Sequence, residues 1–181
     1  MADYKTLHGT NIDTVSSDPD NPVKGQVWYN STSKTLKGRI LSAAAWSSGG
    51  NLNTAKAYLG ATKTGSQTAS LVFGGTPPTN GLTENESYNG SAWTELADLN
   101  TGRYAPGGAG STTAALAFGG ETSPGKKDET ETWNGSSWTE GPDLNTERTG
   151  LAATGTTTAA IAFGGEESPI TGKTETYDGS S

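Results

Sequence analysis

The chain of 181 residues contains no cysteine and only one histidine, His8. Without cysteine, disulfides, thiolate metal sites and cysteine nucleophiles are excluded. His8 lies in a polar stretch near the N-terminus, where we expect a solvated surface residue and not half of a catalytic pair. The sequence therefore offers no histidine cluster for a metal and no catalytic triad, and we expect no enzyme and no cofactor.

Hydrophobic residues make up only 30% of the chain, and no apolar run approaches the ~20 residues of a membrane-spanning helix. The first residues, MADYKTLHGT, have neither the basic start nor the apolar centre of a secretory signal. The formal charge is −7 and the isoelectric point is near 4.6. Because nucleic-acid binders need a basic face, we expect no nucleic-acid partner, no membrane span and no export signal.

Glycine is abundant, with 26 residues, and Thr, Ser and Asn are frequent beside it. A 3.6-residue period of apolar residues is absent along the chain, so an all-β fold of short strands and tight turns is predicted.

A repeat of about 45 residues organises most of the sequence. Its marks are an FGG triplet, an aromatic residue before Asn-Gly or Asp-Gly, and a tryptophan followed six positions later by the Leu of an LNT triplet. The triplets begin at Phe73, Phe118 and Phe163, the second aromatics are Tyr88, Trp133 and Tyr177, and the tryptophans are Trp46, Trp93 and Trp138. A period of this length is typical of propeller blades or solenoid turns.

Each repeat is predicted to form a four-stranded antiparallel meander. In the middle copy the strands are expected at residues 103–110, 114–120, 129–135 and 136–140, with small residues in the first strand because neighbouring sheets converge there. The aromatic side chains of Phe118, Trp133 and Trp138 are expected to fill the wedge between adjacent sheets.

These residues resemble the kelch-repeat β-propellers. The elements of that pattern are AALAFGG, Trp133, Trp138 and Arg148 in one copy, and ASLVFGG, Tyr88, Trp93 and Arg103 in the copy before it. The resemblance covers residues 43–179, with Lys56 in place of the arginine in the first copy. It implies kelch-like blades whose structural residues are Phe73, Gly74, Gly75, Tyr88, Trp93, Arg103, Phe118, Gly119, Gly120, Trp133, Trp138, Arg148, Phe163, Gly164, Gly165 and Tyr177.

The phase of the repeat predicts about three blades over residues 43–181. The chain enters at a fourth strand, residues 43–46, and stops after a third strand at YDGSS, so the last blade is incomplete. Propellers close with about four to eight blades. We therefore expect either a longer parent chain or a homo-oligomer that completes the ring, with an open array of sheets as a third arrangement.

Residues 1–42 form a separate N-terminal region in which a β-hairpin is expected, with Trp28, Tyr29 and Leu36 as anchors. The stretch PVKGQVWYN, followed by a Lys-Thr-Leu-Lys segment, resembles hairpin modules of bacteriophage tail-fibre and virion-surface proteins. That resemblance implies a virion location, docking of the N-terminal region on other virion proteins, and projection of the repeats toward the host.

Several polar residues are candidates for a functional role. Arg103 and Arg148 are expected to pair with Asp98 or Asp143 or with backbone carbonyls, a carboxylate or sugar ligand being the less favoured alternative. Glu129 and Glu131 are interpreted as a solvated strand edge, and DPDN at 18–21 as a turn in preference to a calcium site.

Recognition is expected in three connections between second and third strands, residues 76–82, 121–128 and 166–173. They are predicted to share one face with the DLNT segments. The candidate recognition residues are Thr76, Asn80, Lys126, Lys127, Glu166 and Lys173.

Two functions from different classes follow. The first is a non-enzymatic structural protein of a bacteriophage virion, a fibre or surface appendage with a kelch-like array for host attachment. The alternative is a carbohydrate- or protein-binding kelch propeller of a bacterium, with no virion involved. The three loops contain no aromatic residue, which disfavours a strong lectin.

Overall fold

The computed structural model describes residues 12–20, 26–38, 46–76 and 80–180. The chain divides into two compact units, residues 1–47 and 48–181. Within the described residues every regular element is a β-strand and no helix is present, so none could cross a membrane as a helix. The all-β prediction is confirmed.

The described residues of the N-terminal unit form a three-stranded sheet. Strands β2 (Val27–Asn30) and β3 (Thr35–Gly38) form the predicted hairpin, in which Tyr29 lies opposite Leu36. Strand β1 (Asp13–Val15) adds to β2 in parallel, which the sequence did not predict. Trp28 points to the buried side of the sheet, whereas Tyr29 and Leu36 are exposed on the other side.

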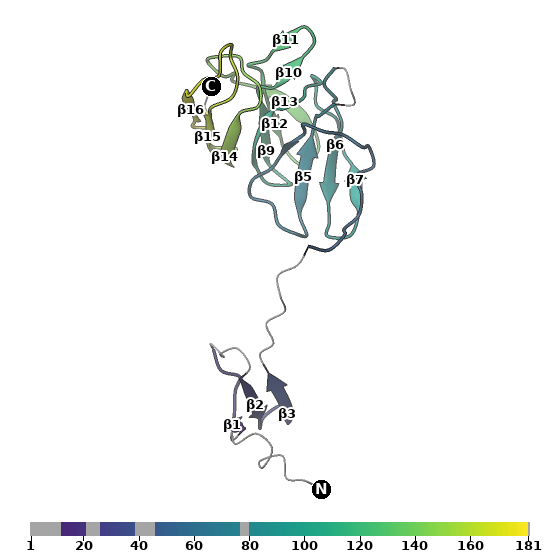
Figure 1. The fold of residues 1–181 in the computed structure, drawn as a ribbon, viewed down its shortest axis with the longest axis vertical. Helices are drawn as coiled ribbons and strands as arrows, with labels where there is room; N and C mark the ends of the chain where they lie inside the picture. The colour runs from purple at the N-terminus through teal and green to yellow at the C-terminus, as the bar shows by residue number, and fades with distance from the viewer. Residues whose placement is uncertain (1–11, 21–25, 39–45, 77–79, 181) are drawn as a thin grey trace. The chain divides into compact units, whose positions relative to one another are not determined.

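Three successive sheets make up the second unit (Figure 1). The first contains β4 (Gly60–Ala61), β5 (Ser70–Phe73), β6 (Asn85–Tyr88) and β7 (Trp93–Glu95). The second contains β8 (Gly107–Gly110), β9 (Ala115–Phe118), β12 (Thr130–Trp133) and β13 (Trp138–Gly141). The third contains β14 (Ala152–Thr156), β15 (Ala159–Phe163) and β16 (Thr174–Tyr177).

Each of these sheets is an antiparallel meander in chain order, as the repeat predicts. The third sheet has three described strands. A two-stranded ribbon, β10 (Glu121–Thr122) and β11 (Gly125–Lys126), occupies the connection between β9 and β12, where only a loop was expected. Residues 43–45 lie outside the described residues, and Trp46 is not part of a strand.

The first strands of neighbouring sheets lie against one another, with β8 between β4 and β14. All four residues of β8 are buried. A side chain at Gly108 would begin only 2.4 Å from the carbonyl oxygen of Ala61 on β4. The small residues of this strand therefore allow two backbones to approach closely, which is the reason predicted for them.

Two hydrophobic cores fill the space between sheets. The first joins the first and second sheets and contains Leu71, Phe73, Leu99, Ala115, Ala117, Trp133 and Trp138. The second joins the second and third sheets and contains Ala109, Leu116, Phe118, Leu151, Ala153, Ala160 and Ala162, with Leu144 and Tyr177 packed against it. Phe73 and Phe118 are buried as expected, but Phe163 is 41% exposed because no described sheet covers the outer face of β15.

Candidate functional site

An ion pair occupies the same position in each sheet of the second unit; it is fully buried in the first two sheets and partly buried in the third. In the second sheet, the guanidinium of Arg103 lies 2.7 Å from the Glu131 carboxylate on β12, and both side chains are fully buried. The same guanidinium donates to the backbone carbonyls of Gly119 (3.2 Å) and Glu129 (2.7 Å). With a further bond from its Nε–H to the Thr101 carbonyl, Arg103 donates to four acceptors of the protein, and its buried side chain presents no edge to a ligand in solvent.

The other sheets repeat this arrangement. Arg148 pairs with Glu175 in the third sheet, and Lys56 lies 2.9 Å from Glu86 in the first. The lysine in the first copy therefore keeps the ion pair. Burial alone would raise the pKa of Glu86, but the Lys56 ammonium and the Asn53 backbone N–H outweigh it and lower that pKa.

The glutamate also fixes the LNT segment. The backbone N–H groups of Asn100 and Thr101 donate to Glu131 at 2.7 and 3.1 Å, and the Asn100 side chain donates to the Trp138 carbonyl at 3.2 Å. One buried carboxylate thus ties the connection between two sheets to the third strand of the following sheet.

The expected pairing of Arg103 and Arg148 is confirmed for backbone carbonyls but not for Asp98 and Asp143. Asp98 accepts from the Thr83 hydroxyl and Asp143 from the Thr130 backbone N–H. A second prediction was wrong. Glu131 is not part of a solvated edge, because a buried arginine needs a carboxylate partner and β12 is the strand beside it. Glu129, its neighbour in the proposed edge, pairs with Lys127 at 3.1 Å.

The three predicted recognition loops lie beside the segments that precede the first strands. Isolated bridges join Leu82 to Arg103, Tyr104 to Glu121 and Thr149 to Glu166. These connections therefore form one loop-built surface, which we call the loop face; residues 77–79 lie outside the described residues.

Each charged candidate on the loop face pairs with an oppositely charged residue of the protein, Lys127 with Glu129. The Lys126 ammonium donates to Glu166 (3.2 Å), to the Glu167 carbonyl (3.0 Å) and to Ser168 (3.0 Å), so it ties two loops together. Lys173 pairs with Glu167 at 3.0 Å. Thr76 exchanges backbone hydrogen bonds with Ala57, and Asn80 is exposed with a φ of 89°.

Two tyrosines on the loop face were not among the candidate residues. Tyr58, which is 70% exposed, and Tyr104 line two adjoining hollows of about 490 and 480 Å³, together with Glu121. A hydrogen bond from the Tyr104 hydroxyl to Glu121, together with burial, raises the pKa of Tyr104. Their positions in the repeat could have identified them: Tyr58 lies two residues after Lys56, and Tyr104 lies one residue after Arg103.

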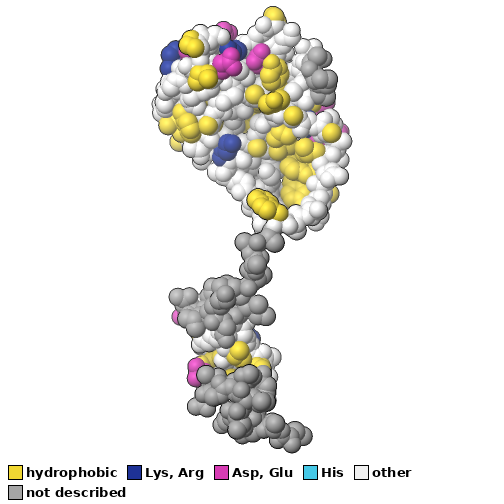
Figure 2. Space-filling view, viewed as in Figure 1, with side chains coloured by type: hydrophobic (Ala, Val, Ile, Leu, Met, Phe, Trp, Pro, Cys, Tyr) yellow, Lys and Arg dark blue, Asp and Glu magenta, His cyan; other side chains and the backbone are white. Residues whose placement is uncertain are grey.

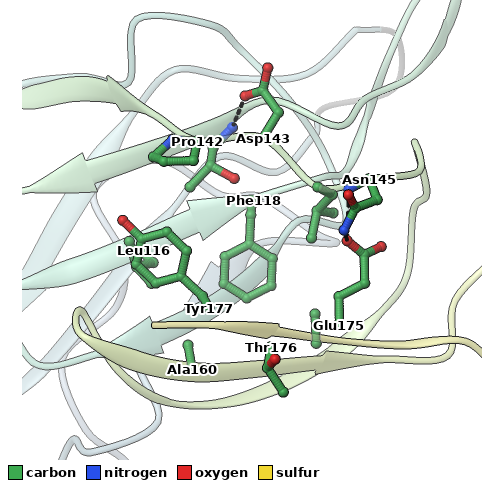
Figure 3. A pocket seen from close by; sticks show the side chains of 12 residues that line it. Leu116, Phe118, Pro142, Asp143, Asn145, Ala160, Glu175, Thr176 and Tyr177 are labelled. Atoms are coloured by element: carbon green, nitrogen blue, oxygen red, sulfur yellow. Dashed lines mark hydrogen bonds between the residues drawn. The ribbon is translucent and has the colours of Figure 1, made fainter. Parts of the chain in front are cut away.

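A third pocket, which we call the edge pocket, opens between the second and third sheets beside β16. Phe118, Leu116, Ala160 and Tyr177 line its apolar side (Figure 3). On the polar side, the Asn145 side chain donates to Glu175 at 2.8 Å.

The N-terminal unit is organised around Asp18. Its carboxylate accepts from the Trp28 indole (3.1 Å), the Asn30 amide (2.8 Å) and the Lys37 ammonium (2.6 Å). Three donors of the protein thus occupy the Asp18 carboxylate, which the calcium alternative would require as a ligand; residue 21 of the stretch 18–21 lies outside the described residues. The opposite side of the sheet exposes Val27, Tyr29 and Leu36.

Among the described residues, no group of His, Asp and Glu side chains is arranged to hold a metal ion. No family model matches the chain, and no curated protein is significantly similar to it.

Proposed function

We propose that this chain is a non-enzymatic structural protein of a bacteriophage virion, a fibre or surface appendage that carries a kelch-like propeller array for contact with the host surface. The observation that carries the proposal is the repeated buried ion pair, Arg103 with Glu131 and its counterparts. Charged residues that recur in every repeat are used to join sheets, as in a scaffold.

The propeller part of the proposal rests on the contacts between sheets. The first strands β4, β8 and β14 lie side by side, and aromatic and alanine side chains fill the space farther out. Crowded first strands, with bulky side chains between the outer strands, are features of sheets arranged around a common axis, and they support a propeller-like array.

The anchoring part rests on the N-terminal unit. Val27, Tyr29 and Leu36 place three large apolar side chains on one side of a sheet of three short strands. Exposed apolar surface of this kind marks a contact with another protein. A neighbouring virion protein is the partner that this proposal assigns to it.

Immunogold labelling tests the virion assignment directly. Antibodies raised against the chain should label intact phage particles purified from the lysate of the source cells, at their surface. Labelling confined to cell debris, with particles free of the protein by mass spectrometry, would rule the proposal out. A chain with Tyr29→Ser and Leu36→Ser should fold but fail to join the particle.

The bacterial carbohydrate- or protein-binding propeller stays as the second candidate because of the tyrosines on the loop face. Tyr58 and Tyr104 line a hollow that also holds the Glu121 carboxylate, and aromatic faces beside carboxylates are suited to sugars. Binding of the chain to an immobilised glycan panel, lost in Tyr104→Ala and kept in Lys63→Ala, together with absence from particles, would favour this candidate.

A further inference from the structure

The residues that line the edge pocket are the repeat counterparts of the residues that surround Trp138 between the first and second sheets. Between the first and second sheets, Trp138 packs among Leu71, Phe73, Ala115, Ala117 and Trp133. The counterparts of these five residues one repeat later are Leu116, Phe118, Ala160, Ala162 and Tyr177, and all five line the edge pocket. The pocket is therefore the Trp138 site of the next repeat, without its indole.

The strand that would carry this indole also has a place. In the second sheet β12 pairs with β9 on one side and with β13 on the other, whereas β16 pairs with β15 and no described residue pairs with its outer edge. Asn100 donates to the Trp138 carbonyl on β13, but its counterpart Asn145 donates to Glu175. An apolar pocket beside a free strand edge fits an added strand that bears one aromatic side chain.

Trp46 is the indole that the repeat provides. It precedes Leu52 by six positions, as Trp138 precedes Leu144, and its side chain is fully exposed, whereas Trp138 is 4% exposed. The LNT segment after Trp46 is already bound to the first sheet: Asn53 donates from its backbone to Glu86 at 2.8 Å and from its side chain to the Trp93 carbonyl at 3.2 Å. In the second sheet, the equivalent LNT segment follows a strand of the preceding sheet, so Trp46 is placed to belong to a sheet that precedes the first.

A second contact fits the same arrangement. Phe73 meets Trp138 across the contact between the first and second sheets. Their counterparts at the two ends of the array are Phe163, which is 41% exposed on the third sheet, and Trp93 on the first sheet, which is only partly buried. Figure 2 shows a band of hydrophobic side chains over the first sheet on the face in view.

We propose that two copies of this chain close into a ring of six sheets, in which Trp46 of each copy fills the edge pocket of the other and extends its third sheet beside β16. The described residues of one copy form three sheets in its second unit, so two copies bring six together, which lies within the usual range of about four to eight for a propeller, whereas three copies would bring nine. The inference rests on the propeller part of the proposed function and not on the virion assignment.

The register of the existing sheets predicts which residues meet. Trp133 lies opposite Trp138 and Thr132 opposite Thr139; in the first sheet Tyr88 lies opposite Trp93 and Ser87 opposite Thr94. By the same register, Tyr177 faces Trp46 of the second copy and Thr176 faces its Ser47. Opposed residues on antiparallel strands are close enough for a disulfide.

Because the chain has no cysteine, cross-linking is free of background. Under mild oxidation, the double variant Ser47→Cys with Thr176→Cys should form one covalent species of two chains. Equal parts of the two single variants should also cross-link, while Ser47→Cys mixed with Thr139→Cys should not. A cross-linked monomer, a ladder of larger species, or no cross-link would each overturn the closed dimer.

Sedimentation of the unmodified chain provides an independent test. The expected mass is about 37 kDa, twice the 18.5 kDa of one chain. Trp46→Ala should sediment as a monomer with its strand circular dichroism retained, and Trp46→Phe should keep the dimer. Tyr29→Ser is the matched control, because it removes an exposed aromatic residue of the N-terminal unit and should leave the dimer intact. A monomeric native chain, or a dimer lost in Tyr29→Ser and kept in Trp46→Ala, would overturn the inference.

Discussion

Phe73 and Trp138 meet edge to face, with ring centroids 5.2 Å apart and ring planes at 71°, although they belong to different sheets. Trp138 also lies 5.4 Å from Trp133 of its own sheet. Edge-to-face pairs add to the stabilisation that comes from buried area. The contact explains why the repeat keeps an aromatic residue in its second strand and an indole in its fourth: one sheet provides each half of the contact.

Replacement of Trp138 by alanine should therefore strongly destabilise the second unit. Loss of a buried indole that joins two sheets is expected to cost about 3 to 5 kcal/mol, because the cavity cannot collapse between two packed sheets. Urea unfolding followed by circular dichroism measures this loss. The Trp46→Ala background, which the proposed pairing makes monomeric, keeps association out of the measurement.

Trp93→Ala is the matched control in the same background. Trp93 holds the equivalent position one repeat earlier, but it packs on Tyr88 and donates to the Gly50 carbonyl without a phenylalanine from a preceding sheet. The sequence alone predicts equal losses for the two tryptophans. The structure predicts a smaller loss of stability for Trp93→Ala, about 1 to 2 kcal/mol. Equal losses for the two variants would contradict the conclusion that the contact with Phe73 is what makes Trp138 more stabilising.

The sequence was sufficient to predict the strands because the repeat marks them three times. Spacing placed β9, β12 and β13 to within one or two residues, and the small residues of β8 correctly indicated a crowded strand. Strand β1 could not be predicted, because its parallel pairing with β2 depends on a contact between segments far apart in the chain and not on a local pattern.

The candidate site was harder to predict for the same physical reason. Glu131 lies between Thr130 and Thr132, a polar pattern typical of a solvated strand, and only the sheet places Arg103 against it. Tyr58 and Tyr104 lie outside the three variable loops, so the search for aromatic residues within those loops missed them. Spacing identifies strands, whereas charge pairing and hollows depend on which strands become neighbours.

The buried ion pair gives a second prediction. Arg103→Ala should cost about 3 to 5 kcal/mol, because it leaves the buried Glu131 carboxylate without a cation. Arg103→Lys should cost less, since Lys56 serves Glu86 in the first sheet, although it loses donors to the Gly119 and Glu129 carbonyls. Urea unfolding gives the free energy of unfolding of both variants. An alanine variant as stable as the lysine variant would show that a positive charge at position 103 contributes little to stability.

The glycine doublets allow a third prediction with a close control. Gly119 and Gly164 have nearly the same backbone, with φ of 63° and 66°. A Cβ at Gly119 would begin 2.7 Å from the Arg148 carbonyl, whereas at Gly164 the nearest atom is 3.8 Å away. Both alanine variants should lose about 1 to 2 kcal/mol through backbone strain, and Gly119→Ala about 1 to 3 kcal/mol more through the clash. Urea unfolding in the Trp46→Ala background measures the loss of stability in both variants. Equal losses would show that the backbone at Arg148 moves away from the added methyl group at no cost in free energy.

Asp18 makes the N-terminal unit sensitive to acid. Hydrogen bonds from Lys37, Asn30 and Trp28 lower its pKa from 3.8 to about 2. The charged carboxylate therefore stabilises the folded unit fully above its ordinary pKa of 3.8, and this contribution disappears as the pH falls through about 2. The Trp28 indole N–H resonance, followed by NMR from pH 6 to pH 1, should keep its hydrogen-bonded shift down to about pH 3 and lose it as the pH falls through about 2. Asp18→Asn should abolish most of this pH dependence and shift the Trp28 signal already at pH 6. A Trp28 resonance that is unchanged down to pH 1 in the native chain would show that this carboxylate does not hold the hairpin.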